Sequence, residues 1–224
     1  MDTRTLSVTE RTRHRRSPDE GRVARADLDA VLGAGFVCHL AFVRDGVPVA
    51  LPTVFGFEPA ADTLYVHGSV ASRSLVDSPG QTVCVTVTHI DGLVLARSLF
   101  EHSVNYRSAL VFGVPRLVAE PEEKLRGLRV VSEQAAPGQW DYARRPSRKE
   151  LAATTLLALG VDEASVKLSI GHPDDGAGPD GDLPVWAGRL PLEHVWGAPE
   201  PDPVLRDGIP VPGHVAARTG TRSE

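Results

Sequence analysis

The segment 36–119 limits the possible folds most, because short apolar runs there are separated by closely spaced turn signals. Asp45-Gly46 stands between two such runs, and this dipeptide is a strong signal for a β-hairpin. Val83, Val85 and Val87 alternate with Cys84, Thr86 and Thr88, as in a strand with one buried face. Short strands at this spacing predict an antiparallel barrel or sandwich rather than a parallel βαβ sheet.

The whole chain reads as mainly β with a few helices. A helix is expected at 23–33 and another from Pro121 to about residue 134. A third is expected to start at a capping box, Ser147 with Glu150, and to run through the leucines up to Gly160. Pro52 interrupts one predicted strand and predicts an edge, a bulge or a point where a ligand meets the backbone. The expected strands are 36–43, 47–57, 64–67, 83–88, 106–118, 164–170 and 184–192.

Composition divides the chain into three parts. Residues 1–20 are predicted to be a flexible basic arm, with Arg11, Arg13, Arg15 and Arg16 either solvated or folded over an anionic ligand or partner. Residues 21–197 form the predicted folded domain, in which 171–182 is an exposed loop. Residues 198–224 are a proline-rich tail, expected to be extended along the surface.

Charge, hydropathy and cysteine content exclude several classes. The net charge of −5 argues against a nucleic-acid-binding surface, and no apolar window is long enough to predict a membrane helix. The start of the chain lacks the apolar core of a secretory signal, so a cytoplasmic protein is expected. Cys38 and Cys84 form neither a disulfide framework nor a metal-binding spacing, so no metal site is predicted.

Residues 64–73 (LYVHGSVASR) carry the most informative local pattern. A strand ends at Gly68, and Ser69, Ser72 and Arg73 gather where a short helix is expected to begin. Backbone N–H groups, hydroxyls and a guanidinium together predict a phosphate site. The alternative is that Ser69 is only a helix cap and Arg73 only a surface residue.

Polar residues also gather at 101–108, where Tyr106, Arg107 and Ser108 enter a strand and face either a ligand or a neighbouring element. Lys167 is one of three lysines and stands in a predicted strand, with either the ligand or solvent as its environment. Trp186 lies in a predicted strand, where a tryptophan is more often a core residue than a platform for a cofactor. The sequence has no G-x-G-x-x-G, P-loop or Ser-His-Asp pattern, which leaves hydrolase, kinase and Rossmann functions without local support.

The order of these segments resembles the FMN-binding split β-barrel family related to pyridoxamine 5′-phosphate oxidase, closest to its nitroimidazole-resistance-type subgroup. The resemblance covers about 16–192. Ser74 stands where the oxidases proper tend to have a lysine, and residues for a substrate phosphate are not identified, so it does not extend to oxidation of pyridoxamine phosphate. The matching stretches are Arg15-Arg16, 38–42 (CHLAF), 46–53 (GVPVALPT), 64–69 (LYVHGS), Ser72-Arg73, 105–108 (NYRS) with Gly113, and 186–188 (WAG).

This resemblance implies a set of cofactor contacts. Leu51, Pro52 and Thr53 would lie along the flavin ring through backbone groups. The ribityl chain and phosphate would be held by Val66, His67, Gly68, Ser69, Ser72 and Arg73. The remaining contacts would come from Tyr106, Arg107, Ser108, Lys167 and Trp186, with the cofactor at a homodimer interface.

The resemblance therefore implies a six-stranded antiparallel Greek-key split barrel with flanking helices, and an FMN-dependent oxidoreductase that acts on a small molecule. His67 is the candidate for a hydrogen-bond donor or acid near the reacting atoms, because imidazole titrates near neutrality. The alternative is a non-catalytic flavin- or haem-binding sensor of the same fold. For haem, the candidate axial ligands are His39, His67, His89 and His102.

Overall fold

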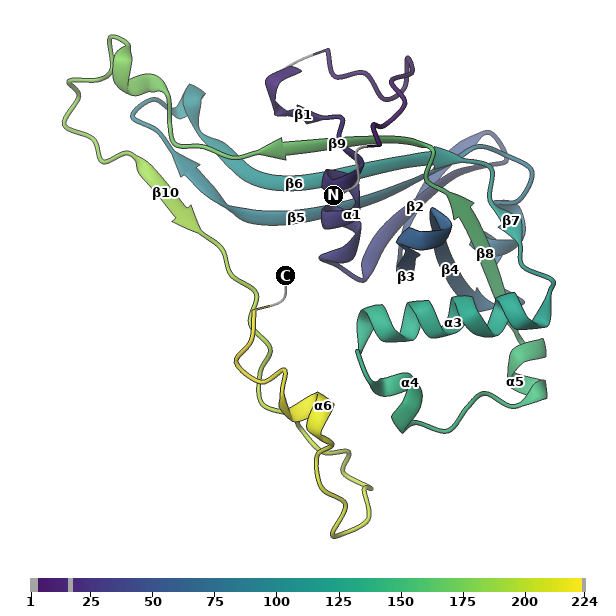
Figure 1. Cartoon of the computed structure of the whole chain (residues 1–224). Helices are drawn as coiled ribbons and strands as arrows, with labels where there is room; N and C mark the ends of the chain where they lie inside the picture. Colours follow the sequence, from purple (N-terminus) through teal and green to yellow (C-terminus); the bar gives the residue numbers. More distant parts are fainter. Residues whose placement is uncertain (1–3, 16–17, 223–224) are drawn as a thin grey trace.

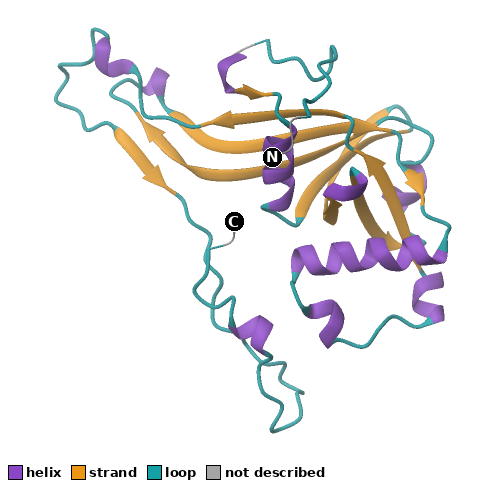
Figure 2. Ribbon diagram, viewed as in Figure 1, coloured by secondary structure: helices purple, strands orange, loops and turns teal. Residues whose placement is uncertain are grey.

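The fold comes from a computed structural model that describes residues 4–15 and 18–222. Arg16, predicted as part of the basic arm, lies outside the described residues. The structure is mainly β with helices, as predicted, and its ten strands form one antiparallel sheet (Figures 1 and 2). The strands are β1 Gly21–Arg22, β2 Val37–Arg44, β3 Val47–Glu58, β4 Thr63–Ser69, β5 Val83–Leu95, β6 Ser103–Gly113, β7 Arg116–Leu117, β8 Thr154–Gly160, β9 Glu163–Ser169 and β10 Gly188–Pro191.

The sheet is larger and more open than the barrel that the resemblance implies. Its strand order is β1-β9-β6-β5-β2-β3-β4-β8-β7, with β10 paired to β5, so the pairings run from one end to the other without closing. The predicted six-stranded Greek-key split barrel is therefore not confirmed. The helices are α1 Arg25–Gly33, α2 Arg73–Asp77, α3 Pro121–Ala135, α4 Gln139–Tyr142, α5 Arg148–Ala152 and α6 Gly213–Ala216, with single 3-10 turns at Pro18–Glu20, Pro59–Ala61, Leu99–Glu101 and Asp175–Ala177.

The hairpin between β2 and β3 confirms the Asp45-Gly46 prediction. Asp45 and Gly46 both have positive φ, 51° and 77°, as a two-residue turn of the right twist requires. The pairing that follows is continuous from Arg44–Val47 to Val37–Val54.

The predicted third helix is wrong over most of its length. The capping box between Ser147 and Glu150 is present, but α5 ends at Ala152, and after one intervening residue Thr154–Gly160 form β8. Thr154 and Thr155 disfavour helix through their branched Cβ, and Leu156–Leu159 are buried between β4 and β7. Pairing with distant strands thus overrides a correct local start signal.

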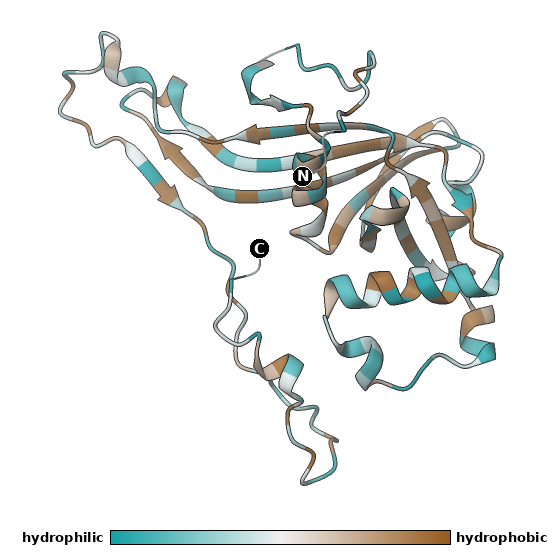
Figure 3. Cartoon of the chain, in the orientation of Figure 1, coloured by the Kyte–Doolittle hydropathy of each residue, from teal (hydrophilic) through white to brown (hydrophobic). Residues whose placement is uncertain are grey.

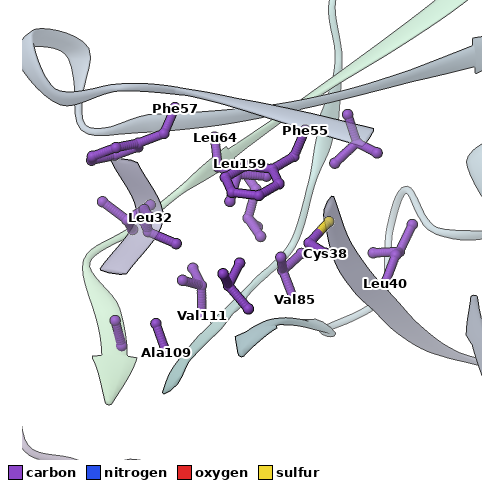
Figure 4. Close-up of a cluster of buried hydrophobic side chains, with 14 of the residues drawn as sticks. Leu32, Cys38, Leu40, Phe55, Phe57, Leu64, Val85, Ala109, Val111 and Leu159 are labelled. Carbon is purple, nitrogen blue, oxygen red and sulfur yellow. The ribbon is translucent and has the colours of Figure 1, made fainter. Parts of the chain in front are cut away.

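The main core lies inside the curved sheet, under α1. It joins Leu32 of α1 to residues of β2, β3, β4, β5 and β8, including Phe55, Leu64 and Val85 (Figure 4). These side chains are almost fully buried and supply most of the hydrophobic stabilisation. The strands carry the hydrophobic stretches, whereas α3 alternates between hydrophobic and hydrophilic residues (Figure 3).

Helix α3 packs on the opposite face of β3, β4 and β8 through two glycines. A Cβ added to Gly56 of β3 would lie 2.5 Å from the backbone nitrogen of Val131. A Cβ added to Gly127 of α3 would lie 2.6 Å from Leu156 Cδ2 and 2.9 Å from Tyr65 Cδ1. The helix backbone therefore rests directly on the strand backbone, and a second small core forms around Tyr65, Val131 and Leu156.

The terminal segments lie against the body. Leu6 is buried, and its N–H donates to the carbonyl of Val23. Arg11 forms an ion pair with Glu163 at 2.6 Å. The chain after β10 leaves the sheet and runs toward α6 (Figure 1), and Trp196 there stacks on Phe36. Within the described part of the chain, no helix is long and apolar enough to span a membrane.

We expect Gly56→Ala to destabilise the fold by about 1–3 kcal/mol, because the new methyl group must displace the backbone of α3. The free energy of unfolding, from urea titration, measures the change. Gly171→Ala is the control, since a Cβ there has open space. Equal stabilities of the two variants would contradict the close contact of α3 with β3.

Candidate functional site

The sheet opens into a fork between β3 and β4. Their pairing ends at Phe55–Val66, and from there β3 pairs only with β2 while β4 pairs only with β8. Thr53 and Gly68 each lie two residues beyond this last pair. We call residues 51–53 and 66–69 the β3–β4 fork.

The fork brings together two groups of predicted cofactor residues. Leu51 and Pro52 are exposed, and Thr53 is half-buried. At these residues β3 pairs with β2 on one edge, and its other edge has no strand partner. Pro52 fits there because an open edge does not require its missing N–H. The free backbone groups on both sides can accept or donate hydrogen bonds to the polar rim of a flat ligand.

The predicted phosphate residues follow directly after the fork. Ser69 Oγ accepts a hydrogen bond from the N–H of Ala71 at 3.2 Å, and Ser72 Oγ lies 3.0 Å from Ser74 Oγ. A Cβ at Gly68 would lie 2.8 Å from Leu75 Cδ1, so α2 packs closely on the end of β4. Helix α2 has only five residues, so the charge for an anion comes chiefly from Arg73.

Arg73 is exposed at the first position of α2, and it makes no hydrogen bond or ion pair with any residue that the structure describes. Most other arginines of the chain are engaged, for example Arg44 with Asp77 and Arg107 with Asp91. An unpaired guanidinium beside two serine hydroxyls has the donors that a phosphate dianion needs.

His67 lies on β4 between these residues and the face covered by α3. It is half-buried, and its Nδ1 is buried without a hydrogen-bond partner among the described residues. Burial lowers the pKa of His67, so the imidazole is neutral at pH 7. A neutral imidazole can donate from one nitrogen and accept at the other.

Tyr106, Ser108 and Lys167 form a second cluster on β6 and β9. Ser108 pairs with Lys167 across the two strands, and Lys167 Nζ lies 5.5 Å from the Tyr106 ring centroid. Lys167 Nζ is also 2.9 Å from Glu20 Oε2. Hydrogen bonds to Tyr106 and to Glu20 raise the pKa of Lys167, and the bond from Lys167 lowers the pKa of Glu20. The ammonium therefore stays protonated, and the carboxylate of Glu20 already balances its charge.

Arg107 and Trp186 lie apart from the fork. Arg107 points to the other side of β6 from Tyr106 and Ser108, and binds both carboxylate oxygens of Asp91 at 3.0–3.2 Å. Trp186 stands before β10 instead of in a strand, packs beside Gly188 and is 67% exposed. Within one chain, neither residue joins the other predicted contacts, and their cofactor roles stay predictions.

A large cavity, which the sequence does not predict, lies between the body and the C-terminal segment. Its volume is about 730 Å³, within the usual range for a ligand site. One wall comes from the turn before β2, from β5 and from Arg107, and the other from the chain after β10. We call it the tail cavity; it is lined by residues 34–37, 88–91, 107, 191–196 and 222.

The histidines that line the tail cavity differ from those that the sequence predicts as haem ligands. Of the four predicted haem-ligand candidates, only His89 lines it; His39 is exposed on the outer face of the sheet, and His102 Nε2 lies 3.1 Å from the carbonyl of Ala96. His194 and Trp196 also line it, and sequence reasoning missed both because they belong to the segment before the proline-rich tail. No group of three or more His, Cys, Asp or Glu side chains in the described ranges is placed to hold a metal ion.

Comparison with known proteins places this geometry in context. A family described as pyridoxamine 5′-phosphate oxidase matches residues 24–168. No curated protein matches the chain.

Many solved structures are similar to the chain, and three of them are described here. The flavocytochrome Anf3 from Azotobacter vinelandii has 33% identity and a TM-score of 0.89, over 96% of this chain and 100% of that one. A FAD and heme binding protein from Mycobacterium smegmatis has 40% identity and a TM-score of 0.85, over 91% and 98%. A 5-nitroimidazole antibiotic resistance protein from Bacteroides thetaiotaomicron, at 20% identity and a TM-score of 0.53 over 64% and 82%, shares the fold.

We expect His67 to make the fold less stable in acid. Its folded-state pKa lies below the usual 6.5, so the unfolded chain binds more protons as the pH falls through that value. The free energy of unfolding then decreases with falling pH, by at most about 1.4 kcal/mol per pH unit for one group. Urea unfolding of the wild type and of His67→Gln at about pH 7.5 and about pH 5.5 measures this contribution.

His172→Gln is the matched control, because His172 is exposed in a loop. It should keep the pH dependence of the wild type, whereas His67→Gln should lose part of it. If His67→Gln and the wild type lose the same stability in acid, the imidazole is not desolvated in the folded state.

Proposed function

The chain belongs to the pyridoxamine 5′-phosphate oxidase family, and from this membership we propose that it is a flavoprotein with its flavin at the β3–β4 fork. We further propose that it acts as an oxidoreductase on a small molecule. The observation that carries the proposal is the guanidinium of Arg73, which has no partner among the described residues and directly follows Ser72 at the start of α2, just after the fork.

The residues at the fork fit the chemistry of a flavin mononucleotide group. Its phosphate is a dianion, which Arg73 and the two serine hydroxyls can bind with charge-assisted hydrogen bonds. Its ring is flat and apolar with a polar rim, which suits the free edge of β3 at residues 51–53. FMN carries the groups that all of these contacts require. FAD, which the similar M. smegmatis protein is described as binding, contains the same ring and ribityl chain, with the phosphate as part of a diphosphate.

When bound, the flavin supplies the redox chemistry, transferring hydride or single electrons at its ring. The chain's own residues bind and orient it. Arg73 fixes the phosphate, and the backbone of Leu51 and Thr53 aligns the ring edge. His67 stays neutral because it is buried, so it can donate a hydrogen bond without introducing a charge.

Haem is a second proposed cofactor. The two similar structures above 30% identity are described as a flavocytochrome and as a FAD and heme binding protein, and both align over more than 90% of this chain. A chain with two cofactors would pass electrons between them. The non-catalytic alternative, a flavin- or haem-binding sensor, differs in having no turnover with a nicotinamide donor.

We also propose a homodimer with the flavin at the subunit interface. The outer face of β2 is uncovered in the described structure: His39 and Val43 are exposed there. A fork that opens to solvent on one side would be closed by a second copy. Nucleic acid and membranes are not proposed as partners, because an acidic net charge of −5 does not favour binding to either anionic surface.

Light scattering should give twice the chain mass of 24.0 kDa. Val43→Arg should shift the protein toward the monomer, since it places a charge on the uncovered face. Val114→Arg is the control, because Val114 has similar exposure, 57% against 50%, but lies beyond β6. A wild type that runs as a monomer at micromolar concentration would refute the dimer.

The purified protein should show a flavin absorption spectrum, and the mass of the released cofactor distinguishes FMN from FAD. Arg73→Ala should weaken the affinity for flavin by about 10- to 100-fold, as expected for the loss of a charged hydrogen bond worth about 1.5–3 kcal/mol. The purified variant should therefore retain less flavin per chain. Flavin titration followed by fluorescence quenching measures the change.

Arg148→Ala is a matched control, since Arg148 is also exposed at the first position of a five-residue helix, α5, and also lacks a partner among the described residues. It should bind flavin like the wild type. If Arg73→Ala retains full flavin affinity, the phosphate does not lie at α2. Reoxidation of the flavin after reduction by a nicotinamide donor would favour the enzyme over the sensor.

A further inference from the structure

The tail cavity is separate from the β3–β4 fork, because none of the residues that line it belongs to the fork. Body residues such as Phe36 and His89 form one wall, and His194 and Trp196 of the C-terminal segment form the other. Its volume of about 730 Å³ is large enough for a flat macrocycle. Its lining contains aromatic, imidazole and guanidinium groups together, whereas the fork residues include no aromatic ring and no guanidinium.

Trp196 gives the cavity a rigid aromatic side. Its ring stacks on Phe36 with centroids 6.1 Å apart and an interplanar angle of 26°. Arg218 Cζ lies 4.0 Å from the same ring centroid, and an Arg218 guanidinium N–H donates to the carbonyl of Ala135 at 2.8 Å. Contacts with an aromatic ring and with a cation thus hold the indole in place.

His194 stands on the C-terminal wall in a segment that is anchored on both sides. The N–H of Leu192 donates to the carbonyl of Asp91 at 3.1 Å, and the N–H of Trp196 donates to the carbonyl of Thr221 at 3.1 Å. His194 itself has no hydrogen bond or ion pair among the described residues, so a ring nitrogen is free to bind a metal ion.

His89, on the opposite wall, is committed elsewhere. Its Nε2 lies 2.9 Å from the carbonyl of Val31. Its ring is also pressed against Gly35, where a Cβ would lie 2.6 Å from Cε1. His89 is therefore a wall residue, and His194 is the imidazole with an available nitrogen. Arg222 and Glu193 also line the cavity, and they form an ion pair at 2.7 Å that balances their charges.

We propose that the tail cavity is the haem site of this chain, where His194 would bind the iron and the side of the cavity formed by Trp196 would contact the ring. This inference rests on the haem part of the proposed function and leaves the flavin part independent. Haem iron in proteins is commonly held by a histidine.

The test is a titration of the purified full-length chain with haemin, followed by the Soret band, with bound flavin measured in the same sample. The wild type should bind one haemin per chain. His194→Gly should weaken binding at least tenfold and change the Soret spectrum, and added imidazole should restore the spectrum. His172→Gly, a change at another exposed loop histidine, should behave like the wild type.

Each outcome separates this inference from the rest. Equal haemin affinity and spectrum for His194→Gly and His172→Gly would overturn the assignment of the ligand. A wild type that gives no Soret shift would overturn the haem site while leaving the flavin measurement to decide the flavin proposal. Arg73→Ala should lose flavin yet keep the haemin affinity of the wild type, which shows that the two sites are distinct.

Discussion

The sheet depends on one strand, β3, which changes its partner along its length. Its first eight residues, Val47–Val54, pair with β2, and its last four, Phe55–Glu58, pair with β4. The sheet must bend where the partner changes, and the bend wraps the two halves around the core of Phe55, Leu64 and Val85. The same change leaves backbone groups free on β3 and β4, so the core and the fork have one cause.

Helix α3 fixes this geometry from the other side. Gly56 belongs to the part of β3 that pairs with β4, and the absence of a side chain there lets the helix backbone lie directly on the strand. Tyr65 and Leu156 fill the space on either side of Gly127. Close contact between helix and sheet holds β4 in place, and β4 in turn positions His67, Gly68 and Ser69.

The sequence predicts correctly those elements that depend on interactions between neighbouring residues. The Asp45-Gly46 hairpin, helix α3 and the alternating part of β5 all follow from neighbouring residues, and all are present. The strand β8 was missed because Leu156–Leu159 look the same in a buried helix and a buried strand, and only pairing with β4 decides between them. The fork residues were found because they lie in short segments with distinctive composition. The tail cavity was not, because its walls come from residues 34–37 and 191–196, which no spacing rule connects.

The anchoring of the C-terminal segment has a consequence for assembly. The wall that holds His194 and Trp196 belongs to the last fifth of the chain, which is synthesised after the sheet it closes. Ribosomal synthesis runs from the N-terminus, so the body can fold while this wall is still absent. The tail cavity therefore does not exist in the body alone and is complete only after the C-terminal segment has docked on the sheet.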